Sequence, residues 1–179
     1  HAGTPERFFA VVWFGSPHSP HEAIARDSAI YAGQSPRLAN FYGEITGMDR
    51  AVGKLREELQ SLNVADNTVF WYCSDNGGLP NAGRTGGRGH KGDIYEGGLR
   101  VPVIIEWPAK IPESRITDMP ANTCDILPTL LEIAGIGSED LPVLDGISLL
   151  PVIDNKMDER PKSMGFWDYP GGGIKTPSK

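Results

Sequence analysis

Three mainly apolar runs divide the chain and predict buried strands. They occupy residues 8–14, 68–73 and 101–107, and the first reads Phe-Phe-Ala-Val-Val-Trp-Phe. A continuous apolar run of about four to eight residues, bounded by turn residues, is typical of a strand buried on both faces, as in a parallel sheet. The first run ends at Gly-Ser-Pro and the second at Ser-Asp-Asn-Gly-Gly. The sequence therefore predicts three strands of one sheet.

A long amphipathic helix is expected between the first two strands, over residues 36–63. Ser35 is a suitable N-cap and Pro36 suits the first helical position. Glycines inside this segment disfavour a coiled coil and favour a helix packed closely against a sheet. Apolar residues recur at alternating steps of three and four, which places them on one stripe of the helix: Leu38, Phe41, Ile45, Met48, Val52, Leu55, Leu59 and Leu62.

A second helix is expected near the end of the chain, with Thr123 as its cap, Ala134 as its last residue and Gly135 as its stop. Residues 15–37 and 77–98 have the composition of loops. The order strand, helix, strand, loop, strand, helix predicts an α/β fold with a mainly parallel sheet flanked by helices.

Composition and charge narrow the class of protein. The 179 residues fit one domain, and the net charge of −6 disfavours a general nucleic-acid binder. No apolar run is long enough to span a membrane, and residues 1–7 lack the apolar region of a signal peptide. The chain has 22 glycines and 15 prolines, roughly one residue in five, against about 12% in average usage, which predicts long loops.

The two cysteines, Cys73 and Cys124, are too few for a disulfide framework. Both lie beside apolar residues, so we expect them to be buried and reduced. One bridge between them remains open, and the cysteine count does not fix the compartment.

Three short segments carry candidate chemistry. Asp75 and Asn76 follow the second predicted strand, and their oxygens suit Ca²⁺ or Mg²⁺, although Asn-Gly is also a favoured turn. His18 lies between two prolines and is able to contact an anion or protonate a leaving group, unless it is an ordinary loop histidine. Lys91 lies in the glycine-rich loop. Its ammonium is able to bind a sulfate or phosphate oxygen, unless it is an ordinary solvated lysine.

Other motifs are absent or carry no signal. The glycine-rich loop lacks the Walker A pattern, which disfavours that kind of nucleotide binding. No Gly-x-Ser-x-Gly nucleophile elbow occurs. His21 and His90 are expected to be ordinary loop histidines.

Taken together, several segments resemble the type I sulfatases, arylsulfatase-like members of the alkaline phosphatase superfamily. The most specific match is the run Gly-His-Lys-Gly-Asp-Ile-Tyr-Glu-Gly-Gly-Leu-Arg-Val-Pro, which resembles the family's Gly-x-Lys-Gly…Glu-Gly-Gly-x-Arg-Val-Pro signature. The resemblance covers roughly residues 8–153. The matching segments, in chain order, are residues 14–20, 42–49, 69–77, 89–102, 125–131 and 145–149.

The resemblance implies roles for four residues. Asp75 and Asn76 would be ligands of a divalent cation, Ca²⁺ or in its place Mg²⁺. Lys91 and His18 would be catalytic and would bind the sulfate group, with His18 as general acid. It further implies a sulfuric ester hydrolase that acts on a sulfated small molecule or carbohydrate and is periplasmic, secreted or lysosomal.

One departure from the family is important. Sulfatases use a formylglycine made in a Cys/Ser-x-Pro-Ser-Arg motif, and this chain contains neither that motif nor the family's tandem aspartates. The chain therefore resembles the C-terminal part of a sulfatase catalytic domain (residues 1–153), followed by an irregular tail (residues 154–179) that leads towards a missing C-terminal subdomain. We expect it to be inactive alone and to associate through an exposed sheet edge. A phosphatase or phosphodiesterase relative, or a non-catalytic binding domain, remains an alternative.

Overall fold

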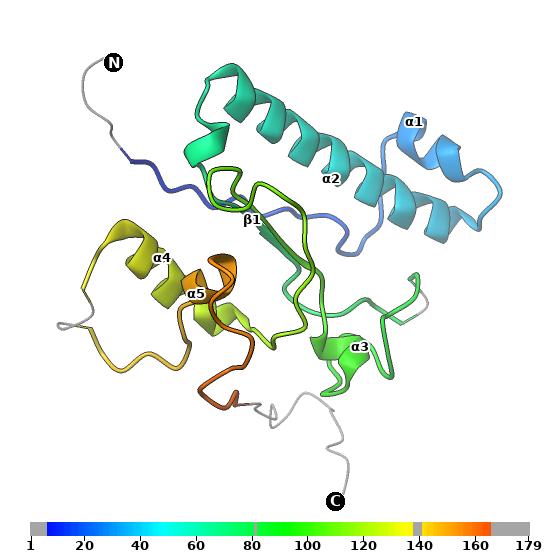
Figure 1. Ribbon diagram of the computed structural model, residues 1–179. Coiled ribbons are helices and arrows are strands. Elements are labelled where there is room, and N and C mark those ends of the chain that lie inside the picture. Colours follow the sequence, from blue (N-terminus) through cyan, green and yellow to red (C-terminus); the bar gives the residue numbers. More distant parts are fainter. Residues whose placement is uncertain (1–6, 81, 138–140, 166–179) are drawn as a thin grey trace, which may run out of the picture. The chain divides into compact units, whose positions relative to one another are not determined.

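A computed structural model describes residues 7–80, 82–137 and 141–165 (Figure 1). The chain divides into two compact units, His1–Glu58 and Leu59–Lys179, which we describe separately. The domain division expected from the sequence, at residues 153 and 154, stays a prediction.

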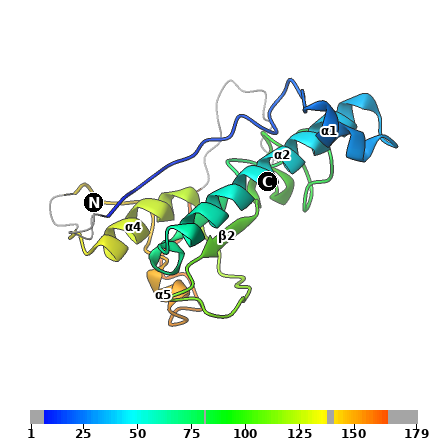
Figure 2. The same cartoon turned by 90° about the horizontal axis from the view of Figure 1, so that it is seen from above.

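The first unit is built around the predicted long helix. This helix, α2, runs over Pro36–Ser61, and the Leu38 amide donates to Ser35 Oγ at 3.4 Å, which confirms the expected start. The preceding segment, expected to be a loop, contains the one-turn helix α1 (Ala25–Ser28) and a 3₁₀ turn (Ala29–Tyr31). Figures 1 and 2 show α1 beside the N-terminal half of α2.

The buried face of α2 is not its apolar stripe. Its buried residues are Ala39, Gly43 and Glu44, whereas Leu38 and Phe41 in the stripe are only half-buried. Gly43 packs against the segment that contains α1, because a Cβ there would lie 2.7 Å from Ala23 Cβ. The expectation that this glycine faces a sheet is therefore wrong: a neighbouring loop approaches the helix here.

Residues 8–14 do not form the predicted strand. They are exposed along their whole length, and Trp13 is 92% exposed. A strand is held by hydrogen bonds to a neighbouring strand. The described residues of the first unit contain no strand, so nothing there pairs with this apolar segment.

The second unit contains the other two predicted strands. β1 (Phe70–Cys73) and β2 (Val103–Glu106) pair with each other, Phe70 opposite Glu106 and Cys73 opposite Val103. The pairing is antiparallel, so the mainly parallel sheet is not seen in the described residues. A parallel pair needs a crossover connection, usually a helix. The described residues between β1 and β2 instead contain one helical turn, α3 (Glu96–Leu99).

The helix expected near the end of the chain is α4, which follows a 3₁₀ turn and ends where expected. Asn122, not Thr123, is the capping residue, because its side chain accepts from the Cys124 amide at 3.0 Å. Gly135 ends the helix with φ 68°, as predicted.

No helix among the described residues is both long and apolar enough to cross a membrane. The remaining bounds are Ala65–Asn67 and Thr123–Asp125 for 3₁₀ turns, Ile126–Ala134 for α4 and Leu150–Ile153 for α5.

A buried carboxylate joins α4 to the end of the described chain. Asp125 is completely buried, and its carboxylate accepts hydrogen bonds from both Arg160 Nη atoms at 2.8 Å. It also accepts hydrogen bonds from the Ile147 amide at 2.8 Å and the Asn122 amide at 2.8 Å. Burial alone would raise the pKa of Asp125. The hydrogen bonds from Arg160 and the two amides outweigh that cost and hold the pKa below its usual range.

Both cysteines are free thiols. Cys73 is half-buried in β1, but Cys124 is exposed, so the expectation that both are buried is wrong for Cys124. The reason is local, since Cys124 lies in the capping turn ahead of α4 and not inside the helix.

Candidate functional site

Asp75 and Asn76 lie at the end of β1, where the chain leaves the sheet. Asp75 is exposed, and in the part of the chain that the structure describes its carboxylate has no partner. Asn76 Oδ1 is buried without a hydrogen-bond partner. The turn is held by Ser74 Oγ, which donates to the Asn76 carbonyl at 2.9 Å. A buried amide oxygen without a donor, next to a carboxylate, fits a hard cation such as Ca²⁺ or Mg²⁺.

These two residues are only part of a cation site. Ca²⁺ takes about six to eight oxygen ligands. Among residues 7–80, 82–137 and 141–165, no three His, Cys, Asp or Glu side chains converge on one point. Asp75 and Asn76 therefore need further oxygen ligands to complete a Ca²⁺ site.

The glycine-rich loop brings Lys91 to the same strand end. The Lys91 amide donates to the Gly78 carbonyl at 2.8 Å, two residues after Asn76. The Gly77 amide donates to the Gly98 carbonyl at 2.9 Å. The two ends of the loop therefore meet next to Asp75 and Asn76 in the chain, and residues 13 and 21 positions apart in the sequence become neighbours.

Glycine is required where these segments meet. A Cβ on Gly77 would lie 1.8 Å from the Gly97 carbonyl oxygen, and a Cβ on Gly97 would lie 2.0 Å from the Gly89 carbonyl oxygen. A Cβ on Gly98 would lie 2.0 Å from the Asp93 carbonyl oxygen. Real Cβ atoms do not approach backbone oxygens this closely, so the loop closes only with glycine at these three positions.

The residues around Lys91 brace one another. His90 Nδ1 contacts the Lys91 carbonyl oxygen at 3.0 Å, and the His90 amide donates to Asp93 Oδ2 at 3.0 Å. The Arg88 guanidinium lies 3.7 Å from the centre of the Tyr95 ring. The half-buried Lys91 side chain has no partner within the described residues, so its ammonium is available to an anion.

His18 belongs to the first unit, whereas Asp75, Asn76 and Lys91 belong to the second. Its side chain is exposed, and its amide donates to the Gly15 carbonyl at 3.1 Å in a tight turn. His18 Nδ1 lies 2.8 Å from the Ser19 carbonyl oxygen. Because that oxygen is an acceptor, Nδ1 is the donor, and Nε2 is left for other contacts.

A buried pair that the sequence did not reveal lies three residues after His18. His21 Nδ1 is 3.0 Å from Glu44 Oε2, and the two side chains are 5% and 8% exposed. The sequence offers no signal for this pair, since Glu44 is one of several charged residues in a long helix.

Comparison with known proteins agrees with this arrangement of segments. The family model named Sulfatase matches residues 2–136. The chain belongs to the sulfatase family. It is 33% identical over 165 residues to the N-acetylgalactosamine-6-sulfatase of Canis lupus familiaris, which covers 87% of this chain and 30% of that protein. It is 34% identical over 157 residues to the steryl-sulfatase of Rattus norvegicus, which covers 82% of this chain and 26% of that protein.

Solved structures of sulfatases and their relatives share the fold. The crystal structure of Ps i-CgsB in complex with k-i-k-neocarrahexaose has a TM-score of 0.75 and 32% identity, and it covers 80% of this chain and 32% of that one. The described residues thus share the alkaline phosphatase-like fold expected from the sequence. The chain spans about 30% of the length of the sulfatase relatives named above.

Cys73 of this sulfatase-family chain is poorly suited to be a nucleophile. Burial, and then the nearby charge of Asp75, raise the pKa of the Cys73 thiol. A thiol with a raised pKa stays protonated at neutral pH, and the thiolate is the nucleophilic form. Cys124 lies outside any Cys-x-Pro-Ser-Arg motif.

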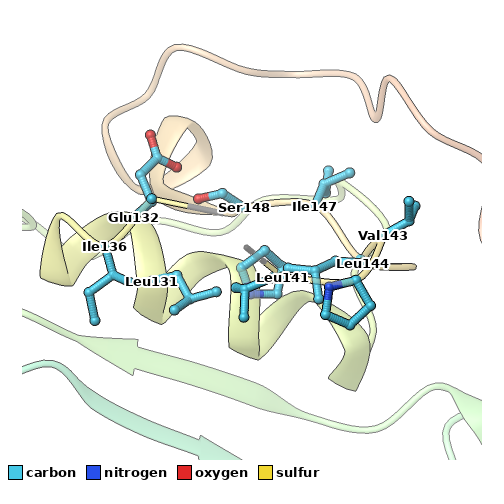
Figure 3. Close-up of a pocket in the computed structure, with 12 residues that line it drawn as sticks. Leu131, Glu132, Ile136, Leu141, Val143, Leu144, Ile147 and Ser148 are labelled. Carbon is cyan, nitrogen blue, oxygen red and sulfur yellow. The ribbon is translucent and has the colours of Figure 1, made fainter. Parts of the chain in front are cut away.

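A groove elsewhere in the second unit contains none of the candidate residues. It has a volume of about 600 Å³ and lies between α4 and the segment that follows it. Figure 3 shows Leu131 and Ile136 on one side and Leu141, Leu144 and Ile147 on the segment that closes it. Most of its lining residues are apolar and none is cationic, so the groove is unsuited to a sulfate group.

Proposed function

We propose that the protein is a sulfuric ester hydrolase in which Lys91 and His18 act on the sulfate group and Asp75 and Asn76 bind a divalent cation. The observation that carries the proposal is the hydrogen bond from the Lys91 amide to the Gly78 carbonyl at 2.8 Å. It holds Lys91, whose ammonium has no partner within the described residues, near the end of β1. Asn76 Oδ1 lies there without a hydrogen-bond partner. A cation-binding oxygen and an anion-binding ammonium at one loop closure suit the negatively charged oxygens of a sulfate ester.

Each protein group has a distinct task in this proposal. The Lys91 ammonium is a point charge that holds a sulfate oxygen and offsets negative charge as the ester bond breaks. His18 donates through Nδ1 to Ser19, so Nε2 is the atom that would carry a proton to the departing alcohol oxygen. His18 is therefore expected to act in its protonated form.

Asp75 and Asn76 would hold the cation, which supplies charge neutralisation at the sulfate oxygens when bound. Ca²⁺ is the cation expected from the family, with Mg²⁺ as the alternative. The fit rests on the two hard oxygen donors and on the buried Asn76 Oδ1 without a hydrogen-bond donor.

The family's formylglycine nucleophile would be supplied from outside these 179 residues, because the chain lacks the motif that produces it. We therefore propose that the chain has no turnover by itself. Turnover of an aryl sulfate by the isolated chain, at a rate comparable with that of the full-length protein, would overturn this statement.

The substrate class is proposed more broadly. A solved relative binds the carbohydrate k-i-k-neocarrahexaose, which supports a sulfated carbohydrate, and a sulfated small molecule is the other expectation. A periplasmic, secreted or lysosomal location and association through an exposed sheet edge stay predictions.

The test compares two lysine variants of the full-length protein on an aryl sulfate and on an aryl phosphate. Lys91→Met is expected to lower kcat by about 10² to 10³, the usual loss when one preorganised charge is removed. Lys54→Met is the matched control, because Lys54 is exposed on α2 and belongs to no candidate site. Equal activity of Lys91→Met and wild type would remove Lys91 from the mechanism, and preferred hydrolysis of the phosphate would favour the phosphatase alternative.

A further inference from the structure

We propose that Glu44 is a positioning residue for His18, acting through His21. The inference rests on the proposed role of His18 in the hydrolysis of the sulfate ester. Glu44 lies on α2, and its two carboxylate oxygens hold the backbone and the side chain of the segment that follows His18.

The contacts form a two-pronged clamp. Glu44 Oε2 accepts from His21 Nδ1 at 3.0 Å, and Glu44 Oε1 accepts from the Glu22 amide at 2.9 Å. One turn earlier on α2, Asn40 Oδ1 accepts from the Ala23 amide at 3.2 Å. Three successive residues of the segment, 21–23, are therefore fixed to one face of α2.

The helix surface is shaped to receive this segment. Gly43 removes the side chain that would collide with Ala23, since a Cβ there would lie 2.7 Å from Ala23 Cβ. Asp27 is buried and accepts from Arg50 Nη2 at 2.5 Å. The segment after His18 is thus anchored at both ends, by Glu44 near its start and by Arg50 near its end.

The chemistry of His21 argues against a role in packing alone. Its ring lies edge-on to Phe41 with 5.2 Å between centroids, as an apolar aromatic residue would. Because Nδ1 donates to Glu44, Nε2 is left buried, and it has no partner within the described residues. A phenylalanine would fill the same space without that unpaired nitrogen, so the imidazole is explained by its bond to Glu44.

The clamp is close enough to His18 to set its position. Only Ser19 and Pro20 separate His18 from His21, and the proline ring fixes its own φ. Three residues of extended chain span at most about 10 Å, so holding His21 confines the His18 backbone to a small volume. A shift of about 1 Å in a catalytic group costs up to about 10²-fold in rate, which makes such confinement valuable.

The experiment is a double-mutant cycle in the full-length protein, with kcat and KM measured on an aryl sulfate. Glu44→Ala is expected to lower kcat about 10-fold to 10²-fold with little change in KM. Glu44→Gln is expected to recover part of the loss, because its amide oxygen still accepts from the Glu22 amide. The control is Glu57→Gln, an exposed glutamate on the same helix, which is expected to leave kcat unchanged.

The decisive arm adds His18→Ala. If Glu44 acts through His18, Glu44→Ala lowers kcat by less than about 2-fold once His18 is already absent. An equal loss in both backgrounds would overturn the proposal and assign Glu44 a purely structural role. If Glu44→Ala fails to fold, Glu44→Gln gives the same comparison.

A second readout separates this inference from the proposed function. If the wild-type protein hydrolyses no sulfate ester, the proposed function fails, and the histidine ring resonances of ¹⁵N-labelled protein decide the inference. The His18 resonance is expected to shift or broaden in Glu44→Gln and to stay unchanged in Glu57→Gln. An unchanged His18 resonance in Glu44→Gln would show that the clamp does not position His18.

Discussion

The two loops that carry the candidate catalytic residues are held in opposite ways. The segment after His18 is fixed by long polar side chains of α2, chiefly Glu44 and Arg50, which bind its backbone and its own side chains. The loop that carries Lys91 is fixed by backbone groups, which approach each other closely because glycine stands at the contact points. One loop depends on the side chains that are present, and the other on side chains that are absent.

The difference predicts how each loop responds to substitution. A hydrogen-bonded side-chain contact contributes a modest net free energy, and its loss leaves neighbours that are able to move or to reach water. Two backbone segments at van der Waals contact cannot yield without displacing the loop. Substitution of a glycine at a contact point of the Lys91 loop should therefore lower the free energy of unfolding most. Substitution of a side chain that holds the segment after His18 should lower it less.

The largest effect is expected for Gly97→Ala. The new Cβ would lie 2.0 Å from the Gly89 carbonyl oxygen, a backbone atom that cannot turn away as the end of a flexible side chain could. We expect a loss of about 4 kcal/mol or more in the free energy of unfolding, above the usual range for overpacking. Chemical denaturation measures it, with Gly86→Ala as control, because a Cβ on Gly86 has no neighbour within 4 Å. Similar losses in both variants would contradict the role assigned to backbone crowding.

The second largest loss in the free energy of unfolding is expected for Asp125→Asn, which tests a side-chain contact that is fully buried. Asp125 is fully buried, and the Arg160 side chain is 7% exposed, so the substitution leaves a buried cation without its counter-ion. Breaking such a pair costs about 3 to 5 kcal/mol. A loss below about 1 kcal/mol would contradict the expectation that a buried ion pair is costly to break.

The same variant makes a prediction about pH. The pKa of Asp125 is held below its usual range, so ionised Asp125 stabilises the fold above its unfolded-state pKa of about 4. That contribution is lost as the pH falls through the lower pKa of the folded state. The difference in unfolding free energy between wild type and Asp125→Asn is therefore expected to shrink from pH 6 towards pH 2, and a constant difference would contradict it.

The smallest effect is expected for Asp27→Ala, which removes the contact between Arg50 of α2 and the segment after His18. Asp27 is buried, but its partner Arg50 is one-third exposed and is able to turn to solvent when the carboxylate is removed. We expect a loss of about 1 to 2 kcal/mol. Asp49→Ala, which removes an exposed carboxylate next to Arg50, is the control and should change the melting temperature little.

Some local signals predicted the structure correctly. The spacing of apolar residues and the Ser35–Pro36 start predicted α2, and Gly135 predicted the end of α4. The glycine-rich segment was recognised as the loop that carries Lys91. The apolar run at residues 8–14 was read as a strand, but a strand needs a partner, and the described residues of the first unit provide none.

By itself the sequence determined the helices α2 and α4, the position of the strand that ends at Asp75 and Asn76, and the family, because these depend on neighbouring residues or on continuous motifs. Only the tertiary structure decided the antiparallel pairing of β1 with β2, the Glu44–His21 clamp and the Asp125–Arg160 pair. The two side-chain pairs join residues 23 and 35 positions apart. A charged residue carries no mark of its distant partner in the sequence, since the partner is chosen by how the chain folds back on itself.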